Sequence, residues 1–314
     1  MAWFRWIAVI ALLFTSLAPA QAQKRIALSF DDVPRGHGPF LTPDQRTEAL
    51  IAALKRARVK QAAFFVNPGR LANPDGASGE ARIAAYVRAG HVIANHSFSH
   101  KSLTDLTAEA YLADIDSAED WLRGRPGRRP WFRYPFLNEG RADKAKRDAV
   151  RAGLDARGLR NGHVTADGYD WYLEGLTIEA IRAGRPVDLA ALRMLYIETM
   201  VGAADFFDGL AVKATGRSPV HMLLLHETDL AALFVEDLVA ALRADGWAIA
   251  TADQAYADPI GRERPDVPSA QGTLTELVAW ERGLPRPRWY ERNDETVLKA
   301  LFDARVLRPT PAAH

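Results

Sequence analysis

The side chains best suited to chemistry in this sequence are two histidines four residues apart, His96 and His100, and an aspartate doublet, Asp31-Asp32. Two imidazoles at this spacing face the same way if the backbone turns helically. A carboxylate brought alongside them completes a set of two nitrogens and one oxygen that leaves metal coordination positions open. The sequence therefore predicts a catalytic metal site.

Each of these features also has a simpler explanation. A His-x3-His pair is common on a helix face, and an aspartate doublet after a strand often caps a helix or forms a turn. Arg133 alone fits a surface arginine that anchors a loop, and His226 alone fits a buried histidine with satisfied hydrogen bonds. Their positions relative to the elements of the fold decide between these explanations.

Apolar periodicity alternates between strand and helix along most of the chain. Strands are predicted at 25–30, 61–66, 91–94, 131–133, 162–165, 221–225 and 247–251. Helices are predicted at 43–57, 79–89, 108–123, 143–152, 177–183, 189–215 and 229–245. This alternation predicts a parallel sheet covered by helices, either open or closed, and about seven or eight strands favour a barrel.

Candidate functional side chains come directly after several of these strands. The aspartate doublet follows the first strand, His96 follows the third, Arg133 ends the fourth and His226 follows the strand 221–225. Because the carboxyl ends of parallel strands lie on one face of an α/β fold, we expect these residues to converge. The joint pattern favours one site over several unrelated structural roles.

Five short motifs occur in order between Arg25 and Ala257: Ser29-Phe30-Asp31-Asp32, His96-Ser97-x-x-His100, Arg133-x-Pro135, Asp170-Trp171 and Leu224-x-His226. Together they make this segment similar to the polysaccharide deacetylases of the NodB-homology type, carbohydrate esterase family 4. The resemblance implies a distorted (β/α)7-type barrel. It also implies metal-dependent removal of acetyl groups from sugars, usually the N-acetylglucosamine units of peptidoglycan or chitin.

Carried over by position, the resemblance gives Asp32, His96 and His100 as metal ligands and Asp31 as the catalytic base. His226 corresponds to the general acid that protonates the leaving amine. For that role the imidazole must be protonated at the working pH, which a neighbouring carboxylate favours.

The resemblance gives the remaining site residues supporting roles. Asp170 corresponds to the carboxylate beside His226, and Arg133 is expected to hold Asp31 by a bidentate ion pair. The backbone N–H of Phe136 is the expected oxyanion donor. The side chains of Trp171 and Leu224 are expected to form the walls of the acetyl-methyl pocket.

The chain departs from the family pattern in three places. Val33 precedes Pro34 where the family usually has glycine, which puts the fit of the substrate in doubt more than metal binding. Arg133-Tyr134-Pro135-Phe136 lacks the second proline and the tyrosine usual in that motif. The segment between Trp171 and His221 is long for the family, and we expect it to form a lid or a groove wall.

The two ends of the chain differ in character from the middle. Residues 1–22 read as a secretory signal, with Arg5 before a short apolar run and a small-x-small cleavage site at Ala20-Gln21-Ala22. An uncleaved anchor or a core helix is the alternative. Residues 23–257 are predicted to form the barrel, and 258–314, with helices at 274–282 and 294–304, an extension packed on it.

Charge and composition exclude several classes of partner. The chain has 40 Lys+Arg and 39 Asp+Glu, and residues 1–22 carry one arginine and no acid, so the mature chain has 39 of each. This balance gives no electrostatic reason to expect nucleic acid or an anionic membrane as a partner. With 0 cysteines, disulfide frameworks and thiolate chemistry are excluded.

The sequence thus predicts an exported, periplasmic or secreted deacetylase of an acetylated carbohydrate, with a divalent metal, zinc by preference, and no stable membrane insertion after signal cleavage. One alternative keeps the metal and changes the bond, to a cyclic amide or to the ester of acetylated xylan. A second alternative is a carbohydrate-binding homologue that has lost catalysis.

Overall fold

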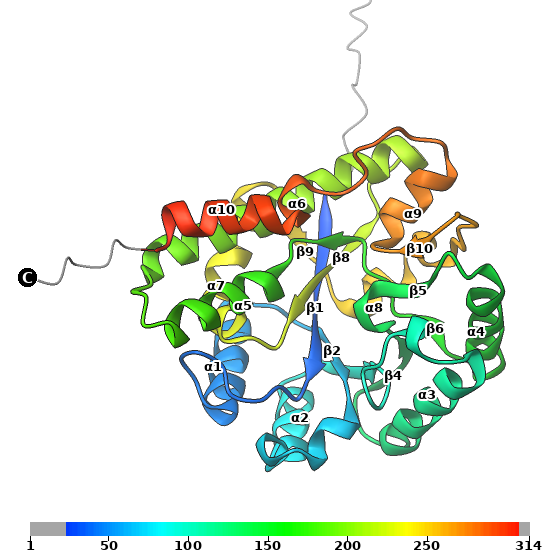
Figure 1. Ribbon diagram of the computed structural model, residues 1–314, viewed down its shortest axis with the longest axis horizontal. Helices are drawn as coiled ribbons and strands as arrows, with labels where there is room; N and C mark the ends of the chain where they lie inside the picture. The colour runs from blue at the N-terminus through cyan, green and yellow to red at the C-terminus, as the bar shows by residue number, and fades with distance from the viewer. Residues whose placement is uncertain (1–22, 308–314) are drawn as a thin grey trace, which may run out of the picture.

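The computed structural model describes residues 23–307, so the predicted signal segment lies outside the described residues. Within them, an eight-stranded parallel sheet has the order β6-β4-β3-β2-β1-β8-β7, with β9 paired to the start of β1 off this path. The sheet curls into an inner layer with helices around it (Figure 1). Its strands are β1 (Arg25–Val33), β2 (Ala63–Val66), β3 (Val92–Asn95), β4 (Arg128–Phe132), β6 (Arg160–Asn161), β7 (Ala166–Asp167), β8 (Val220–His226) and β9 (Ala248–Ile249).

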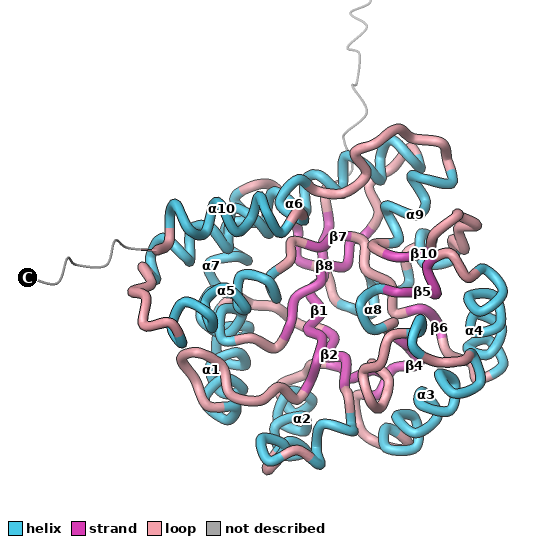
Figure 2. The backbone as a smooth tube through the Cα atoms, in the orientation of Figure 1, coloured by secondary structure: helices cyan, strands magenta, loops and turns pink. Residues whose placement is uncertain are grey.

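Most of the helices alternate with these strands and lie around the sheet, as Figure 2 shows. A separate two-stranded antiparallel sheet, β5 (Asn138–Arg141) with β10 (Ala270–Gln271), was not predicted. The α-helices are α1 (Pro43–Arg56), α2 (Gly79–Arg88), α3 (Ala108–Leu122), α4 (Lys144–Ala156), α5 (Asp170–Arg182), α6 (Leu189–Thr215), α7 (Asp229–Ala244), α8 (Ala252–Ala257), α9 (Leu274–Glu281) and α10 (Glu295–Arg305).

The predicted distorted (β/α)7-type barrel with a C-terminal helical extension is confirmed. The barrel is distorted because its sheet does not close. Among the described residues, the edge strands β6 and β7 do not pair with each other. The prediction of a strand at 162–165 is wrong, because this segment crosses the gap between them. The amide of Gly162 donates to Phe132 O at the end of β4, whereas the amide of Thr165 donates to Met222 O on β8.

Alternation along β1 separates the two cores of the molecule. Ile26, Leu28 and Phe30 face the helices and join the main apolar cluster, whereas Ala27 joins a second cluster inside the barrel. Since successive strand residues point to opposite faces, Ser29 and Asp31 share the inward direction of Ala27. The barrel interior is therefore small and apolar at its base and polar near the carboxyl ends of the strands.

The segment between Trp171 and His221 consists mainly of two helices, α5 and α6. Helix α5 begins at Asp170, before the predicted start at Thr177, and α6 spans the predicted residues. Helix α6 packs against α7, α9 and α10 on the outside of the sheet, whereas α5 begins beside His226, so a groove-wall role for the segment stays a prediction. No helix within the described ranges is long and apolar enough to cross a bilayer.

Phe64 gives a direct test of the helix-facing core. Its ring stacks between Phe30, with centroids 5.0 Å apart, and Tyr86, at 3.9 Å. Because Phe64 is fully buried, Phe64→Ala is expected to lower the free energy of unfolding by about 3–5 kcal/mol in chemical denaturation. Met194→Ala, at a side chain that is 54% exposed, is the control and should stay within about 0.5 kcal/mol. Equal losses in the two variants would contradict this account of the core.

Candidate active site

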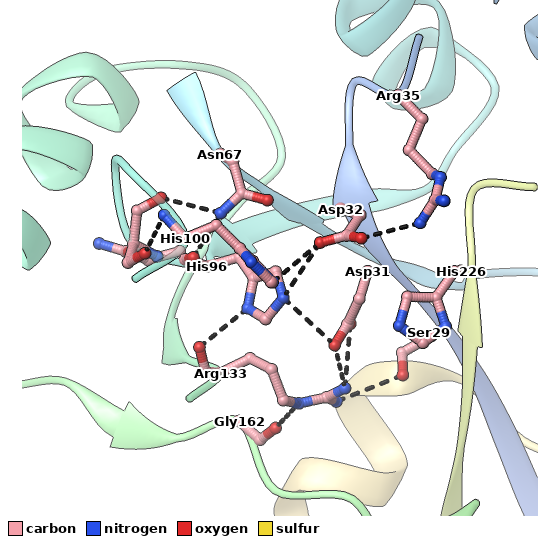
Figure 3. Close-up of polar contacts among 12 residues, drawn as sticks. Ser29, Asp31, Asp32, Arg35, Asn67, His96, His100, Arg133, Gly162 and His226 are labelled. Carbon is pink, nitrogen blue, oxygen red and sulfur yellow. Dashed lines mark hydrogen bonds and ion pairs between the residues drawn. The ribbon is translucent and has the colours of Figure 1, made fainter. Parts of the chain in front are cut away.

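The aspartate doublet lies within β1 and does not follow it as predicted. In a regular strand, two consecutive side chains point to opposite faces. Here the register with β2 shifts between Phe30 and Val33, and Asp32 has a left-handed backbone with φ 72°. This irregularity lets both carboxylates reach the carboxyl end of the sheet, where Figure 3 shows them side by side.

The two histidines converge through a bend, and the premise that the segment is helical is wrong. His96 follows β3, and the residues from His96 to His100 form no helix. Ser97 and His100 have φ values of 65° and 57°. The amide of Ser97 donates to Asn95 Oδ1 at 2.7 Å, and that of His100 donates to Ser97 Oγ at 2.9 Å. Short polar side chains therefore bring the two imidazoles together.

The predicted ligand set assembles at this end of the sheet. One donor atom from each of Asp32, His96 and His100 lies within 4.8 Å of the others. His100 Nε2 is 3.0 Å from Asp32 Oδ1, and His96 Nε2 is 3.8 Å from the same oxygen. Asp32 Oδ1 is buried, and the charged or polar nitrogens of His100 and Arg70 each lie 3.0 Å from it, so it is an oxygen placed to meet positive charge.

The electrostatics of this set suit a cation. Burial, together with the charge of His100, holds the pKa of His96 well below its ordinary value and favours the neutral imidazole that ligates metals. Burial alone would raise the pKa of Asp32. The hydrogen bond from His100 and the charge of Arg70 outweigh it, so the pKa of Asp32 lies well below its usual range.

Two arginines that the sequence analysis did not select contact Asp32. Arg35 Nη1 is 2.8 Å from Oδ2, and Arg70 Nη2 is 3.0 Å from Oδ1. Arg70 also donates to the backbone carbonyl of Asp32 at 2.9 Å. These guanidinium groups fix the orientation of the carboxylate, a support that ligand carboxylates commonly have.

Asp31 is held by Arg133 inside the barrel. Arg133 Nη1 lies 3.0 and 3.1 Å from the two oxygens of Asp31, so one nitrogen bridges both, in place of the bidentate pair expected. The other guanidinium nitrogens donate to Ser29 Oγ at 3.2 Å, to Tyr256 OH at 2.8 Å and to the carbonyl of Gly162. Burial raises the pKa of Asp31, and the charge of Arg133 opposes this rise.

His226 lies directly across from Asp31, because β1 and β8 pair these two residues in parallel register. Asp170, at the start of α5, accepts from the amide of His226 at 2.8 Å and lies 2.7 Å from its Nδ1. Burial alone would lower the pKa of His226, but the charge and hydrogen bond of Asp170 raise it to about 9. The imidazole is therefore charged at neutral pH.

The three remaining predicted residues lie around this centre. Phe136 has a left-handed backbone, φ 59° and ψ 19°, and its exposed ring lies 4.8 Å from that of His100. Leu224 is buried on β8, in register with Ser29. Trp171 is 38% exposed at the start of α5. The oxyanion and pocket-wall roles of these residues stay predictions.

Buried carboxylates fasten the loop between β1 and α1 against the site. Glu227 accepts from the amide of Arg35 at 2.7 Å and from Tyr86 OH at 2.7 Å. Asp229 accepts from the amides of Phe40 and Leu41 at 2.7 and 2.8 Å. A Cβ on Gly38 would lie 2.2 Å from Asp229 Oδ2, so glycine is required at that close approach. The loop that carries Arg35 is thus firmly positioned.

Several residues of the site carry no sequence motif. Tyr256 reaches Arg133 from α8, far along the chain, and no local pattern indicates it. Asn67 had a detectable signal, since it follows β2, and it donates to the carbonyl of Ser97 at 3.1 Å. His37, in the loop after β1, is exposed, and its Nδ1 lies 3.0 Å from Asp75 Oδ1.

Part of this sequence is similar to known polysaccharide deacetylases. Residues 18–156 match the family model of polysaccharide deacetylase. A chitin deacetylase from Colletotrichum lindemuthianum is 30% identical over 114 residues, which cover 36% of this chain and 42% of that protein. The chain therefore aligns with less than half of that relative.

Solved structures give further matches. A family 4 carbohydrate esterase from Streptomyces lividans, in complex with acetate, has a TM-score of 0.48 and 19% identity, over 74% of this chain and 95% of that one. A peptidoglycan deacetylase from Bacillus subtilis has a TM-score of 0.46 and 22% identity, over 75% of this chain and 91% of that one.

The fold and the converging side chains define an incompletely closed α/β barrel with a candidate metal site at the carboxyl ends of its strands. The segment that matches the family model contains the aspartate doublet, both histidines of the ligand set and Arg133, so these residues lie in the part of the chain that is similar to polysaccharide deacetylases. Asp170 and His226 lie beyond the matched residues and are joined to the site by the structure.

The raised pKa of His226 can be tested without any assay of activity. Asp170→Asn removes the charge that stabilises the imidazolium, so the pKa of His226 should fall from about 9 by more than about 1 unit. An NMR titration of the imidazole measures this change. Asp120→Asn, the same substitution at an exposed carboxylate paired with Arg123, is the control. An unchanged pKa of His226 in Asp170→Asn would contradict the assignment.

Proposed function

We propose that the protein is an exported, metal-dependent hydrolase that removes acetyl groups from sugars of a polysaccharide such as peptidoglycan or chitin. The acetyl group is carried on the sugar nitrogen or, by extension, on an oxygen. One observation carries the proposal: the set Asp32, His96 and His100 lies beside two pairs of matched charge, Asp31 with Arg133 and His226 with Asp170. The family match and the similarity to a chitin deacetylase support the same activity.

The donor set fits a divalent ion. Two imidazoles and one carboxylate are the ligands of many catalytic zinc sites, and one donor atom from each of the three residues lies within 4.8 Å of the others. Zinc is our first choice, although such sites also accept cobalt and other ions. Held there, the ion would supply Lewis acidity and ease the deprotonation of water.

Asp31 is the proposed base. Its carboxylate takes the proton from the attacking water, which then forms a bond to the acetyl carbonyl carbon. Arg133 holds this carboxylate in place through Nη1, so the base needs no reorientation during the step. The tetrahedral oxyanion requires a positioned donor, and the backbone N–H of Phe136 is the proposed one.

His226 is the proposed acid. The protonated imidazole donates the Nε2 proton to the leaving nitrogen as the carbon–nitrogen bond breaks, while Asp170 keeps Nδ1 engaged. Because the pKa of His226 is raised to about 9, this proton is present at neutral pH. Acetate and the free amine of the sugar are the products.

Other parts of the proposal concern the whole chain. We assign residues 1–22 as a cleaved signal peptide, 23–257 as the deacetylase barrel and 258–314 as an extension packed on it. In the described part of this extension, α9 and α10 pack against α6. We place the protein in the periplasm or outside the cell.

Paired variants separate metal binding from proton transfer. Asp31→Asn should keep the metal and lose at least about 100-fold in kcat, because only the base is removed. His96→Ala should lose both metal and turnover. Metal analysis of the purified variants, together with acetate release, measures the two effects. Full activity in Asp31→Asn would disprove the base assignment, and retained metal in His96→Ala would disprove the ligand assignment.

A substrate panel tests the bond that is cleaved. The purified, metal-loaded enzyme should release acetate from N-acetylglucosamine oligomers or peptidoglycan fragments faster than from acetylated xylan, and should not open hydantoin-like cyclic amides. Asp31→Asn is the control for background hydrolysis. Faster turnover of the ester or the cyclic amide would show that the protein is a metal-dependent hydrolase of a different bond. Binding without turnover of any compound in the panel would indicate a carbohydrate-binding homologue.

A further inference from the structure

A hollow of about 620 Å³ lies at the amino-terminal end of the sheet. Arg25, the first residue of β1, pairs there with Ala248, which lines the hollow, whereas Asp32 lies near the other end of the strand. At about 3.3 Å per strand residue, the hollow is roughly 20 Å from the candidate metal ligands. It is therefore separate from the proposed active site.

The lining of the hollow is positively charged. It contains three cations and no carboxylate, namely Arg58, Lys60 and Arg243 among Gln23, Trp247, Ala248, Ile249, Thr251 and Gln254. All three cations are exposed, and none has an ion pair with any residue from 23 to 307. Asp205 and Asp245, which are near Trp247, both contact Lys24 at 2.7 and 2.9 Å.

Stabilisation of helix ends explains only part of this pattern. Arg58 follows the end of α1 and Arg243 lies in the last turn of α7, where a cation interacts favourably with the helix carbonyls. Lys60 precedes β2 and belongs to neither helix. A purely stabilising role also does not require the three charges to line one hollow, whose other lining residues are uncharged.

We propose that this hollow binds a phosphate-bearing ligand. Guanidinium groups match the geometry of phosphate oxygens, and an ammonium group adds a third donor site. The volume lies in the range of small-molecule sites. Since the chain from residue 23 onward has 39 cations and 39 acids, the field is local to the hollow. The phosphate has two possible sources, a free phosphate compound or the headgroup of an anionic lipid.

Removal of the three charges tests the site. The triple variant is Arg58→Gln, Lys60→Gln and Arg243→Gln, and the matched control removes three exposed cations elsewhere, Arg88→Gln, Arg182→Gln and Arg185→Gln. Binding of inorganic pyrophosphate is measured by calorimetry at low salt. Binding to vesicles is measured by sedimentation, with phosphatidylglycerol in phosphatidylcholine compared with phosphatidylcholine alone. Circular dichroism checks that each variant is folded.

The triple variant should lose about tenfold or more in affinity, and the control should match wild type. A loss confined to phosphatidylglycerol vesicles identifies a lipid headgroup, and a loss confined to pyrophosphate identifies a free phosphate compound. Pyrophosphate held at the metal site would be retained in the triple variant and so cannot imitate this result. Equal losses in the two variants, no loss in the triple variant, or no binding by wild type overturn the proposal.

Discussion

The buried guanidinium of Arg133 is the interaction on which the rest of this structure depends. It lies inside the barrel, above the ring of Phe65 at 4.2 Å, and bridges both oxygens of Asp31. It also donates to Tyr256 and to the carbonyl of Gly162. Its own carbonyl accepts from His96 Nδ1 at 2.9 Å. One residue thus joins the proposed base, a proposed metal ligand and the segment that crosses the open side of the barrel.

A buried cation of this kind is costly unless its partners are fixed, since leaving either charge unpaired inside a protein is strongly destabilising. Here the partners come from β1, from the residues after β6 and from α8, so the pairing requires the barrel to be assembled. The same pairing keeps the carboxylate of Asp31 oriented toward the ligand set, with His226 on its other side (Figure 3). The same contacts of Arg133 therefore hold the barrel together and set the charges of the site.

Much of the fold could be predicted because period-two and helical patterns are local. The long helix 189–215 and the strand at 221–225 are seen in the structure with small changes of boundary. The segment 162–165 was misjudged because its amides pair with two different strands, β4 and β8, a fact that only the tertiary structure contains. The start of α5 was placed too late, at Thr177, and that helix begins at Asp170.

The positions of the site residues were predictable from strand ends, but their supports were not. Arg35 and Arg70 reach Asp32 from loops with no motif, and Tyr256 comes from a helix that the sequence did not indicate. The turn that joins the two histidines was expected to be helical, and it depends instead on acceptors supplied by Asn95 and Ser97. Contacts between distant residues of this kind leave no periodic trace in a sequence.

The left-handed residues of the site have a consequence for how the protein can change. Asp32, Ser97, His100 and Phe136 all have positive φ, a conformation that costs most residues about 1–2 kcal/mol each. Glycine would relieve this cost at every one of these positions and would delete a side chain of the site, including two proposed ligands. Selection for stability alone would therefore erode this centre, so its retention requires that stability come from elsewhere in the fold.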